Sequence, residues 1–200
     1  MAVIEVGREE ARELSLRQRW SHYLVIGYVL VMFLIALNMR DSTLYATVPY
    51  QDVRAGVRVL YPQNWLLDTS GDYIFRVRDM TSPDFKTTIL IQIQPISPVT
   101  TARNLLDNLS LSRSQSLSGY RQFPRQEVTL GEDIAATSMA YTFTFSEVDP
   151  FLQSVPIPVQ GLDIVVIQRE QAVIITFQAS AERYDELFPY FETFLADLEF

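Results

Sequence analysis

An uninterrupted apolar stretch near the N-terminus is the strongest pattern in this chain of 200 residues. Residues 23–37 contain no charged side chain. A helix of that length rises only about 22 Å, less than the roughly 30 Å of a bilayer's hydrocarbon core, but the flanking residues extend the stretch to 20–39. Arg19 and Arg40 bracket it, and their long side chains can reach the lipid headgroups. The pattern predicts a transmembrane helix over residues 20–40.

Two other structures compete with a membrane anchor for this stretch. A cleaved signal peptide has a short apolar core, but here the preceding arm carries four glutamates beside four arginines, and no small-x-small cleavage site follows. A buried helix of a soluble domain usually shows a polar stripe, and residues 23–37 show none. The sequence favours an uncleaved anchor, and a signal peptide remains the main alternative.

Arginines on the two sides of the span predict its orientation. The N-terminal arm contains Arg8, Arg12, Arg17 and Arg19, whereas only Arg40 and Arg54 follow within a similar distance. Positive residues concentrate on the cytoplasmic side of membrane proteins, and acidic residues count little in this rule. We therefore expect a cytoplasmic arm over 1–19, a single pass through the cell membrane, and an extracytoplasmic C-terminal domain.

Beyond the span, alternating apolar and polar positions predict a sheet. Residues 41–55 show no clear period and are expected to form a linker, so that the folded domain covers 56–200. Alternation and turn residues predict strands over 57–61, 73–78, 87–96, 120–130, 135–146, 161–169 and 172–180. The predicted fold class is α+β, an antiparallel sheet of about seven strands with helices packed on it as an α-β-α sandwich.

Two helical patterns accompany these strands. Thr100 or Thr101 is expected to cap a helix that buries Leu105 and Leu109, with Leu106 as a further candidate for its buried face. The chain closes with a second helix, in which Leu187, Phe191, Phe194 and Leu198 recur at helical spacing. Pro189 is expected in the first turn of that helix, where a missing N–H is tolerated.

Composition narrows the chemistry that the domain can perform. The net charge is −8, and an acidic domain repels nucleic acid, so we expect no nucleic-acid partner. The chain has no cysteine, and its one histidine, His22, lies at the membrane edge. Thiol and histidine-based catalysis are thus excluded from the outer domain, and we expect no enzyme, no cofactor and no metal site. The carboxylate pairs, which lack the spacing of a known calcium loop, are interpreted as solvated turns: Asp68 with Asp72, Glu132 with Asp133, and Glu147 with Asp149.

A small set of aromatic and proline positions resembles a known family. These positions are Tyr61-Pro62 and Trp65 after the first strand, and Tyr184, Pro189, Phe191-Glu192 and Leu198-Glu199-Phe200 after the final hairpin. With the order of elements, they look like the PsbP-like α-β-α sandwich family, which includes the extrinsic PsbP protein of photosystem II. The resemblance covers about residues 56–200. It implies a docking or accessory subunit, and no ligand-binding motif is carried over. The chain departs from the family in its N-terminal helix, which is expected to stay uncleaved.

A proline-rich loop over residues 147–160 is the first candidate contact site. It contains the apolar residues Phe151, Leu152, Val155, Ile157 and Val159. Prolines stiffen a loop and reduce the entropy lost on binding, so these residues are candidates for a partner-docking loop. In the alternative, the loop folds back and covers the sheet.

The second candidate site lies within the span. Gly27 is its only glycine, Val31 lies one turn on, and Tyr28 places a hydroxyl well inside the apolar region. Small residues permit close approach of helices in lipid, so Gly27, Tyr28 and Val31 are predicted to contact another transmembrane helix. In the alternative, the helix is a bare tether.

Two functions remain open from sequence alone. The first is an accessory or docking subunit of a larger membrane protein complex, with the lipid bilayer and other transmembrane subunits as partners. The second is a tethered module that binds a small ligand or an envelope polymer. That module would use an aromatic cleft formed by Trp65, Tyr73, Tyr120 and Tyr141.

Overall fold

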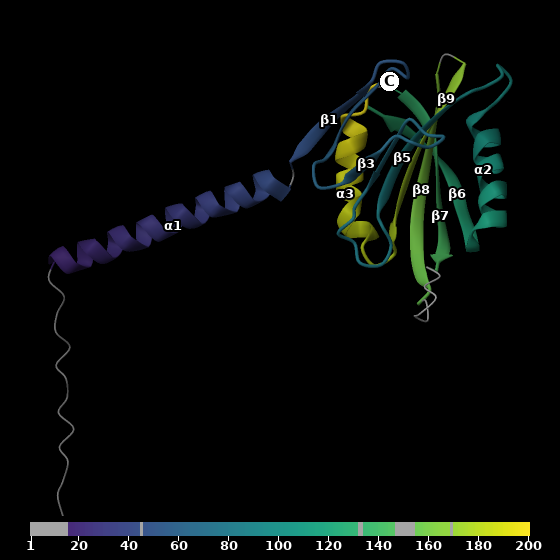
Figure 1. The fold of residues 1–200 in the computed structure, drawn as a ribbon. Helices are drawn as coiled ribbons and strands as arrows, with labels where there is room; N and C mark the ends of the chain where they lie inside the picture. The colour runs from purple at the N-terminus through teal and green to yellow at the C-terminus, as the bar shows by residue number, and fades with distance from the viewer. Residues whose placement is uncertain (1–15, 45, 132–133, 147–154, 169) are drawn as a thin grey trace, which may run out of the picture. The chain divides into compact units, whose positions relative to one another are not determined.

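The computed structural model describes residues 16–44, 46–131, 134–146, 155–168 and 170–200. The chain divides into two compact units, residues 1–46 and residues 47–200, which are described separately. The first unit contains helix α1, Leu16–Leu44 (Figure 1). Within α1, Arg19–Arg40 is long and apolar enough to cross a membrane, and none of it is buried against other parts of the described chain. It fits a single span or a signal anchor.

The predicted linker over 41–55 is wrong for most of its length. Helix α1 continues to Leu44, and strand β1, Thr47–Asp52, follows almost at once. β1 pairs antiparallel with β2, Val57–Pro62, in a two-stranded sheet. Tyr50 explains why the chain is ordered here, because its ring lies 5.0 Å from that of Phe75 and its hydroxyl donates to the Ile74 carbonyl at 2.9 Å. The folded domain therefore begins at Thr47, not at residue 56.

A seven-stranded antiparallel sheet forms the centre of the domain, which confirms the predicted α+β class. Its order is β3-β4-β5-β9-β8-β7-β6, and every neighbouring pair is antiparallel. The strands are β3 Leu66–Asp68, β4 Phe75–Arg78, β5 Thr88–Pro95, β6 Ser118–Leu130, β7 Ile134–Phe145, β8 Ile157–Gln168 and β9 Gln171–Ser180. The sheet has β3 and β6 at its two edges.

One helix covers each face of this sheet (Figure 1). Helix α3, Tyr184–Ala196, and the β1–β2 hairpin lie over the face called here the α3 face, and helix α2, Ala102–Ser116, lies over the α2 face. The α3 face holds the largest apolar core, in which Phe191 is fully buried and stacks on Phe177 at 4.8 Å. Burial of Leu187, Phe191 and Phe194 agrees with the helical spacing in the sequence, whereas Leu198 lies beyond the end of α3 and is only partly buried.

Pro189 is not in the first turn of the last helix. Helix α3 begins at Tyr184, with Arg183 at the N-cap, so Pro189 lies inside it. Its exposed ring faces outward. The hydrogen bond that proline cannot donate is therefore lost on the solvent side, where water can satisfy the freed carbonyl.

Candidate binding groove beside helix α2

Helix α2 is attached to the sheet by a small apolar contact. Thr101 caps it by accepting a hydrogen bond from the Asn104 N–H at 3.3 Å, as the sequence predicts. Leu105 and Leu106 are its buried residues. They belong to a cluster drawn mainly from β7, β8 and β9, namely Leu105, Leu106, Met139, Val165, Ala172 and Ile174. No residue of β6 belongs to this apolar cluster, and space remains between the start of α2 and β6.

Three adjoining hollows fill that space and form one groove. Their volumes are about 490, 420 and 350 Å³. The largest and the smallest share Glu127 and Thr137, and the smallest shares Arg103 and Arg125 with the third. The groove therefore runs along β6 beside the first half of α2. Its remaining lining residues are Thr101, Ala102, Gln122, Phe123, Pro124, Gln126, Val128, Thr129, Ala135, Ala136, Met139, Val165 and Ile167.

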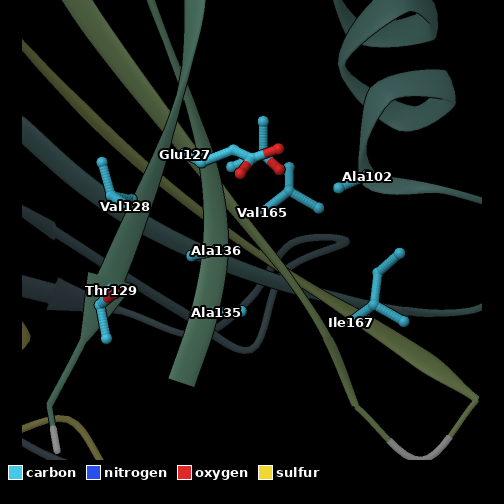
Figure 2. Close-up of a pocket in the computed structure, with 9 residues that line it drawn as sticks. Ala102, Glu127, Val128, Thr129, Ala135, Ala136, Val165 and Ile167 are labelled. Atoms are coloured by element: carbon cyan, nitrogen blue, oxygen red, sulfur yellow. The ribbon is translucent and has the colours of Figure 1, made fainter. Parts of the chain in front are cut away.

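Short side chains open the largest hollow. Figure 2 shows Glu127 and Val165 extending into the space between the strands and Ala102 at the start of α2, with Ile167 nearby. Ala102 and Ala135 contribute only a methyl group each, so neither the helix nor β7 fills the gap. The hollow thus has a mixed wall, apolar at Ala102, Val165 and Ile167 and polar at Glu127, Thr129 and Thr137.

Charged side chains line the middle of the groove. Arg125 on β6 forms an ion pair with Asp107 on α2, and Ser110 donates a hydrogen bond to Gln122. Arg103 and Glu127 are exposed, and neither has a hydrogen-bonding or ion-pair partner among the side chains that the structure describes. The groove therefore presents one free guanidinium group and one free carboxylate.

A buried ion pair attaches the second half of α2 to the sheet. The carboxylate of Asp163 on β8 is fully buried and pairs with Arg113. Its Oδ1 accepts from Arg113 Nη2 at 2.9 Å and from the Thr176 hydroxyl at 2.7 Å. Burial raises the pKa of Asp163 above the usual range for aspartate, although the charge and hydrogen bonds of Arg113 oppose that rise. The carboxylate of Asp163 lies beneath the helix and is not accessible to a partner.

Tyr141 completes this buried polar cluster. Its ring lies 4.3 Å from the guanidinium carbon of Arg113, and its hydroxyl accepts from Gln178 Nε2 at 2.8 Å. The ring passes over Gly161, where an added Cβ would lie 2.2 Å from Tyr141 Cζ. Sequence reasoning missed the cluster. The available signal was Asp163, a single charge in the otherwise apolar run of a predicted inward-facing strand.

The structure contradicts the predicted docking loop at two of its five residues. β8 begins at Ile157, which pairs with Phe145, so Ile157 and Val159 are strand residues. Val159 is fully buried in a cluster with Tyr141 and Phe143 and cannot serve as a docking residue. Val155 is 75% exposed. Phe151 and Leu152 lie outside the described residues.

The four aromatic residues assigned to one ligand cleft do not come together. Trp65 is buried in the core of the α3 face, whereas Tyr141 is buried on the α2 face. Of the four, only Tyr120 and Tyr141 have their rings in contact, at 5.7 Å. The aromatic ligand cleft is therefore wrong, because Trp65 and Tyr73 lie just before β3 and β4 at one edge of the sheet, whereas Tyr120 and Tyr141 lie in β6 and β7 towards the other edge.

The carboxylates near the edge strand β3 are held by local hydrogen bonds. Asp68 accepts from Ser70, Arg76 and Tyr73, and these bonds hold its pKa well below the usual range. This assigns Asp68 a structural role. No group of three His, Asp or Glu side chains that could hold a metal ion occurs among the described residues. Two of the carboxylate pairs that the sequence suggests as solvated turns, Glu132 with Asp133 and Glu147 with Asp149, lie outside the described residues.

Asp79 is a second carboxylate with a lowered pKa. Burial raises its pKa, but hydrogen bonds from Thr81 and Ser82 and the charge of Arg183 outweigh that effect. Arg183 also donates to the Ser82 hydroxyl at 2.7 Å. These contacts tie the loop after β4 to the start of α3.

The residues predicted to contact another membrane helix are all exposed on α1. Tyr28 is 63% exposed and Val31 is 52% exposed. A Cβ added at Gly27 would meet no atom within 4 Å. This face is available to a neighbouring helix, and the lateral contact stays a prediction.

Comparison with known proteins identifies the fold of the domain. No protein-family model matches the chain, and no curated protein sequence matches it. Among solved structures, cyanobacterial PsbP (CyanoP) from Synechocystis sp. PCC 6803 is similar with a TM-score of 0.55 at 15% identity, covering 77% of this chain and 92% of that protein. LpqN, involved in cell envelope biogenesis of Mycobacterium tuberculosis, gives 0.51 at 13% identity, covering 76% and 89%. The Ran-binding protein Mog1p of Saccharomyces cerevisiae gives 0.50 at 7%, covering 78% and 95%.

These similarities establish a PsbP-like fold for residues 47–200, as the sequence resemblance implied. At sequence identities this low, structural similarity shows a shared fold and does not show a shared activity.

Proposed function

We propose that this protein is a membrane-anchored accessory subunit, whose PsbP-like domain lies on the extracytoplasmic side and docks within a larger membrane protein complex. The observation that carries the proposal is the covalent connection between its two units. α1 ends at Leu44 and β1 begins at Thr47, so only two residues join the helix to the domain. A connection this short keeps Thr47 within about 20 Å of Arg40 at the end of the span.

Such tethering favours partners in the same membrane. Confinement to a thin layer raises the effective concentration of the domain near other membrane proteins, so weak contacts suffice for stable association. The excess of arginines before the span supports an outside position for the domain. A binding role is supported by one protein of this fold that is described as Ran-binding, and a place in the cell envelope by another that is described as involved in cell envelope biogenesis.

Within the span, the proposal assigns the helix contact to Gly27 and its neighbours. Without a hydrophobic driving force between helices in lipid, close packing depends on small side chains. Gly27→Leu adds a bulky side chain where nothing in the described chain obstructs it, so it should disturb only a partner helix. Ala36→Leu is the matched control, since nine residues at 100° per residue place Ala36 on the opposite face of α1.

The test is purification of the full-length protein from its native membrane in mild detergent. We expect membrane subunits to co-purify with the wild type and with Ala36→Leu, and to be reduced or lost with Gly27→Leu. Membrane insertion should be equal in all three. A protein that runs as a monomer with no membrane subunit would refute the docking role, and a C-terminal tag protected from protease in intact cells would refute the orientation.

A further inference from the structure

The outer edge of β6 contains a regular stretch with no strand beside it. Residues 125–130 pair in continuous register with β7, from Arg125 opposite Met139 to Leu130 opposite Ile134. β6 is the last strand of the sheet as described. In an antiparallel strand, alternate residues point their N–H and C=O groups away from the paired neighbour. This stretch therefore offers backbone groups that another extended chain can pair with.

The rest of the sheet's perimeter is closed to such pairing. The first half of β6 has register shifts between Ser118 and Arg121 and between Gln122 and Arg125, and it contains Pro124. Bulges and proline are features that prevent edge-to-edge association. The opposite edge strand, β3, has only three residues. Within the described sheet, residues 125–130 are the one regular open edge.

The open edge and the groove share residues. Arg125, Glu127 and Thr129 belong to the edge and also line the hollows. They are spaced by two, so they face the same side of the sheet, the α2 face. A chain added beside β6 would place every second side chain over this face at intervals of about 7 Å, in line with the row of hollows.

The charged residues that line the groove indicate which side chains of a bound peptide it favours. Arg103 is exposed and has no partner among the described residues, and Arg125 lies beside it with Asp107 as its partner. The guanidinium group of Arg103 favours an acidic side chain close to it, at the end of the groove away from the carboxylate of Glu127. The neighbouring hollow, walled by Ala102 and Val165, favours an apolar one.

An extended peptide fits this site better than a small molecule does. Small-molecule sites enclose most of the ligand's surface, whereas these hollows lie beside an edge strand with no further strand to wall them. A peptide that adds to a sheet gains affinity from main-chain hydrogen bonds and specificity from alternate side chains, and the edge and groove provide both.

We infer that residues 125–130 of β6 and the groove beside α2 bind an extended segment of a partner subunit, which pairs with β6 and sets an acidic side chain over Arg103 and Arg125 and an apolar one in the hollow between Ala102 and Val165. This inference rests on the proposed function, because the partner is a subunit of the complex on which the domain docks.

Position-specific photo-crosslinking in the native membrane tests the inference. A benzophenone-bearing amino acid is placed in the full-length protein at Gln126 or at Thr129, which are exposed beside the open edge. Ser112, exposed on α2, is the control position. Arg103→Glu reverses the free charge of the groove. The matched control is Arg54→Glu, the same change at an exposed arginine in the turn between β1 and β2.

We expect adducts from Gln126 and Thr129, mapped by mass spectrometry, to fall in one short segment of one partner polypeptide that contains an acidic residue. Ser112 should give no adduct with that segment. Arg103→Glu should lower the adduct yield about tenfold, because a like charge then faces the acidic side chain, and Arg54→Glu should not.

Two results would overturn the inference while leaving the proposed function intact. In the first, the complex co-purifies but Gln126 and Thr129 give no adduct or only lipid adducts. In the second, the adducts join two copies of this chain, which would make β6 a contact between copies. Absence of any co-purifying subunit would instead refute the proposed function, and the inference with it.

Discussion

Replacing Arg113 with methionine tests how α2 is held over the sheet. The change keeps an unbranched apolar stem and removes the guanidinium group that lies over Tyr141 and pairs with Asp163. The Asp163 carboxylate is fully buried, and Thr176 would remain its one hydrogen-bond donor among the side chains described. Removing one partner of a buried ion pair costs about 3–5 kcal/mol, because the other charge is left without compensation. We expect a loss in that range for Arg113→Met.

Asp163→Asn should cost less than Arg113→Met. The side chain of Arg113 is 15% exposed, so its charge can be partly hydrated after the change. The asparagine oxygen can still accept from Thr176, and the expected loss is about 1–3 kcal/mol. The double replacement Arg113→Met with Asp163→Leu removes both charges and should cost less than the sum of the single changes.

The pH dependence of the unfolding free energy of Arg113→Met tests this explanation more directly than the loss at one pH does. Burial already raises the pKa of Asp163, and removal of Arg113 raises it further. The native state then binds a proton more readily than the unfolded chain does, so the free energy of unfolding falls as pH rises through the raised pKa. The deficit of Arg113→Met relative to wild type should shrink as pH decreases toward 5.

The assay is urea unfolding of residues 46–200 followed by circular dichroism at several pH values. Equal losses for Arg113→Met and Asp163→Asn, with no dependence on pH, would refute the view that an uncompensated buried carboxylate is the cause. A loss below about 1 kcal/mol for Arg113→Met would show that the apolar contact alone holds α2.

Three further predictions concern the stability of the domain. A fragment of residues 46–200 should fold as a soluble monomer, whereas residues 56–200, which lack β1, should be less stable by circular dichroism and thermal unfolding; equal stability would make β1 dispensable. Phe191→Ala should cost about 3–5 kcal/mol because it empties a fully buried aromatic position, and a loss under 1 kcal/mol in urea would contradict its packing. Asp68 and Asp79 have lowered native pKa values, so their contribution to stability is present above about pH 4 and is lost as pH falls through those values. Replacing both with Asn should weaken the dependence of the unfolding free energy on pH below about 4, and an unchanged dependence would contradict this.

Local patterns in the sequence predicted most of the fold. The alternation from Ala135 to Phe145 marked a strand with one buried face, and the cap at Thr101 marked the start of α2. The spacing of Leu187, Phe191 and Phe194 identified the buried face of α3. These features depend on neighbours within a few residues, which is why a single sequence reveals them.

Where strand and loop compete, the outcome was decided by contacts between distant segments. The pattern around Tyr50 was too short to separate a strand from a linker, and its place is set by Phe75 across the core. Ile157 and Val159 looked like loop residues beside three prolines, but pairing with β7 makes them the start of β8. The energy of pairing between distant strands cannot be inferred from a short segment of the sequence.

The apolar span, the class of the domain, its acidity and its lack of cysteine were determined by the sequence alone, because composition and local periodicity are sufficient to specify them. The tertiary structure alone decided that Asp163 meets Arg113, that Gly161 lies under Tyr141, and that β6 is an edge strand beside a groove. Those features depend on the order of strands in the sheet and on which helix lies over which face. That order is fixed by the packing of the whole domain and not by any one segment.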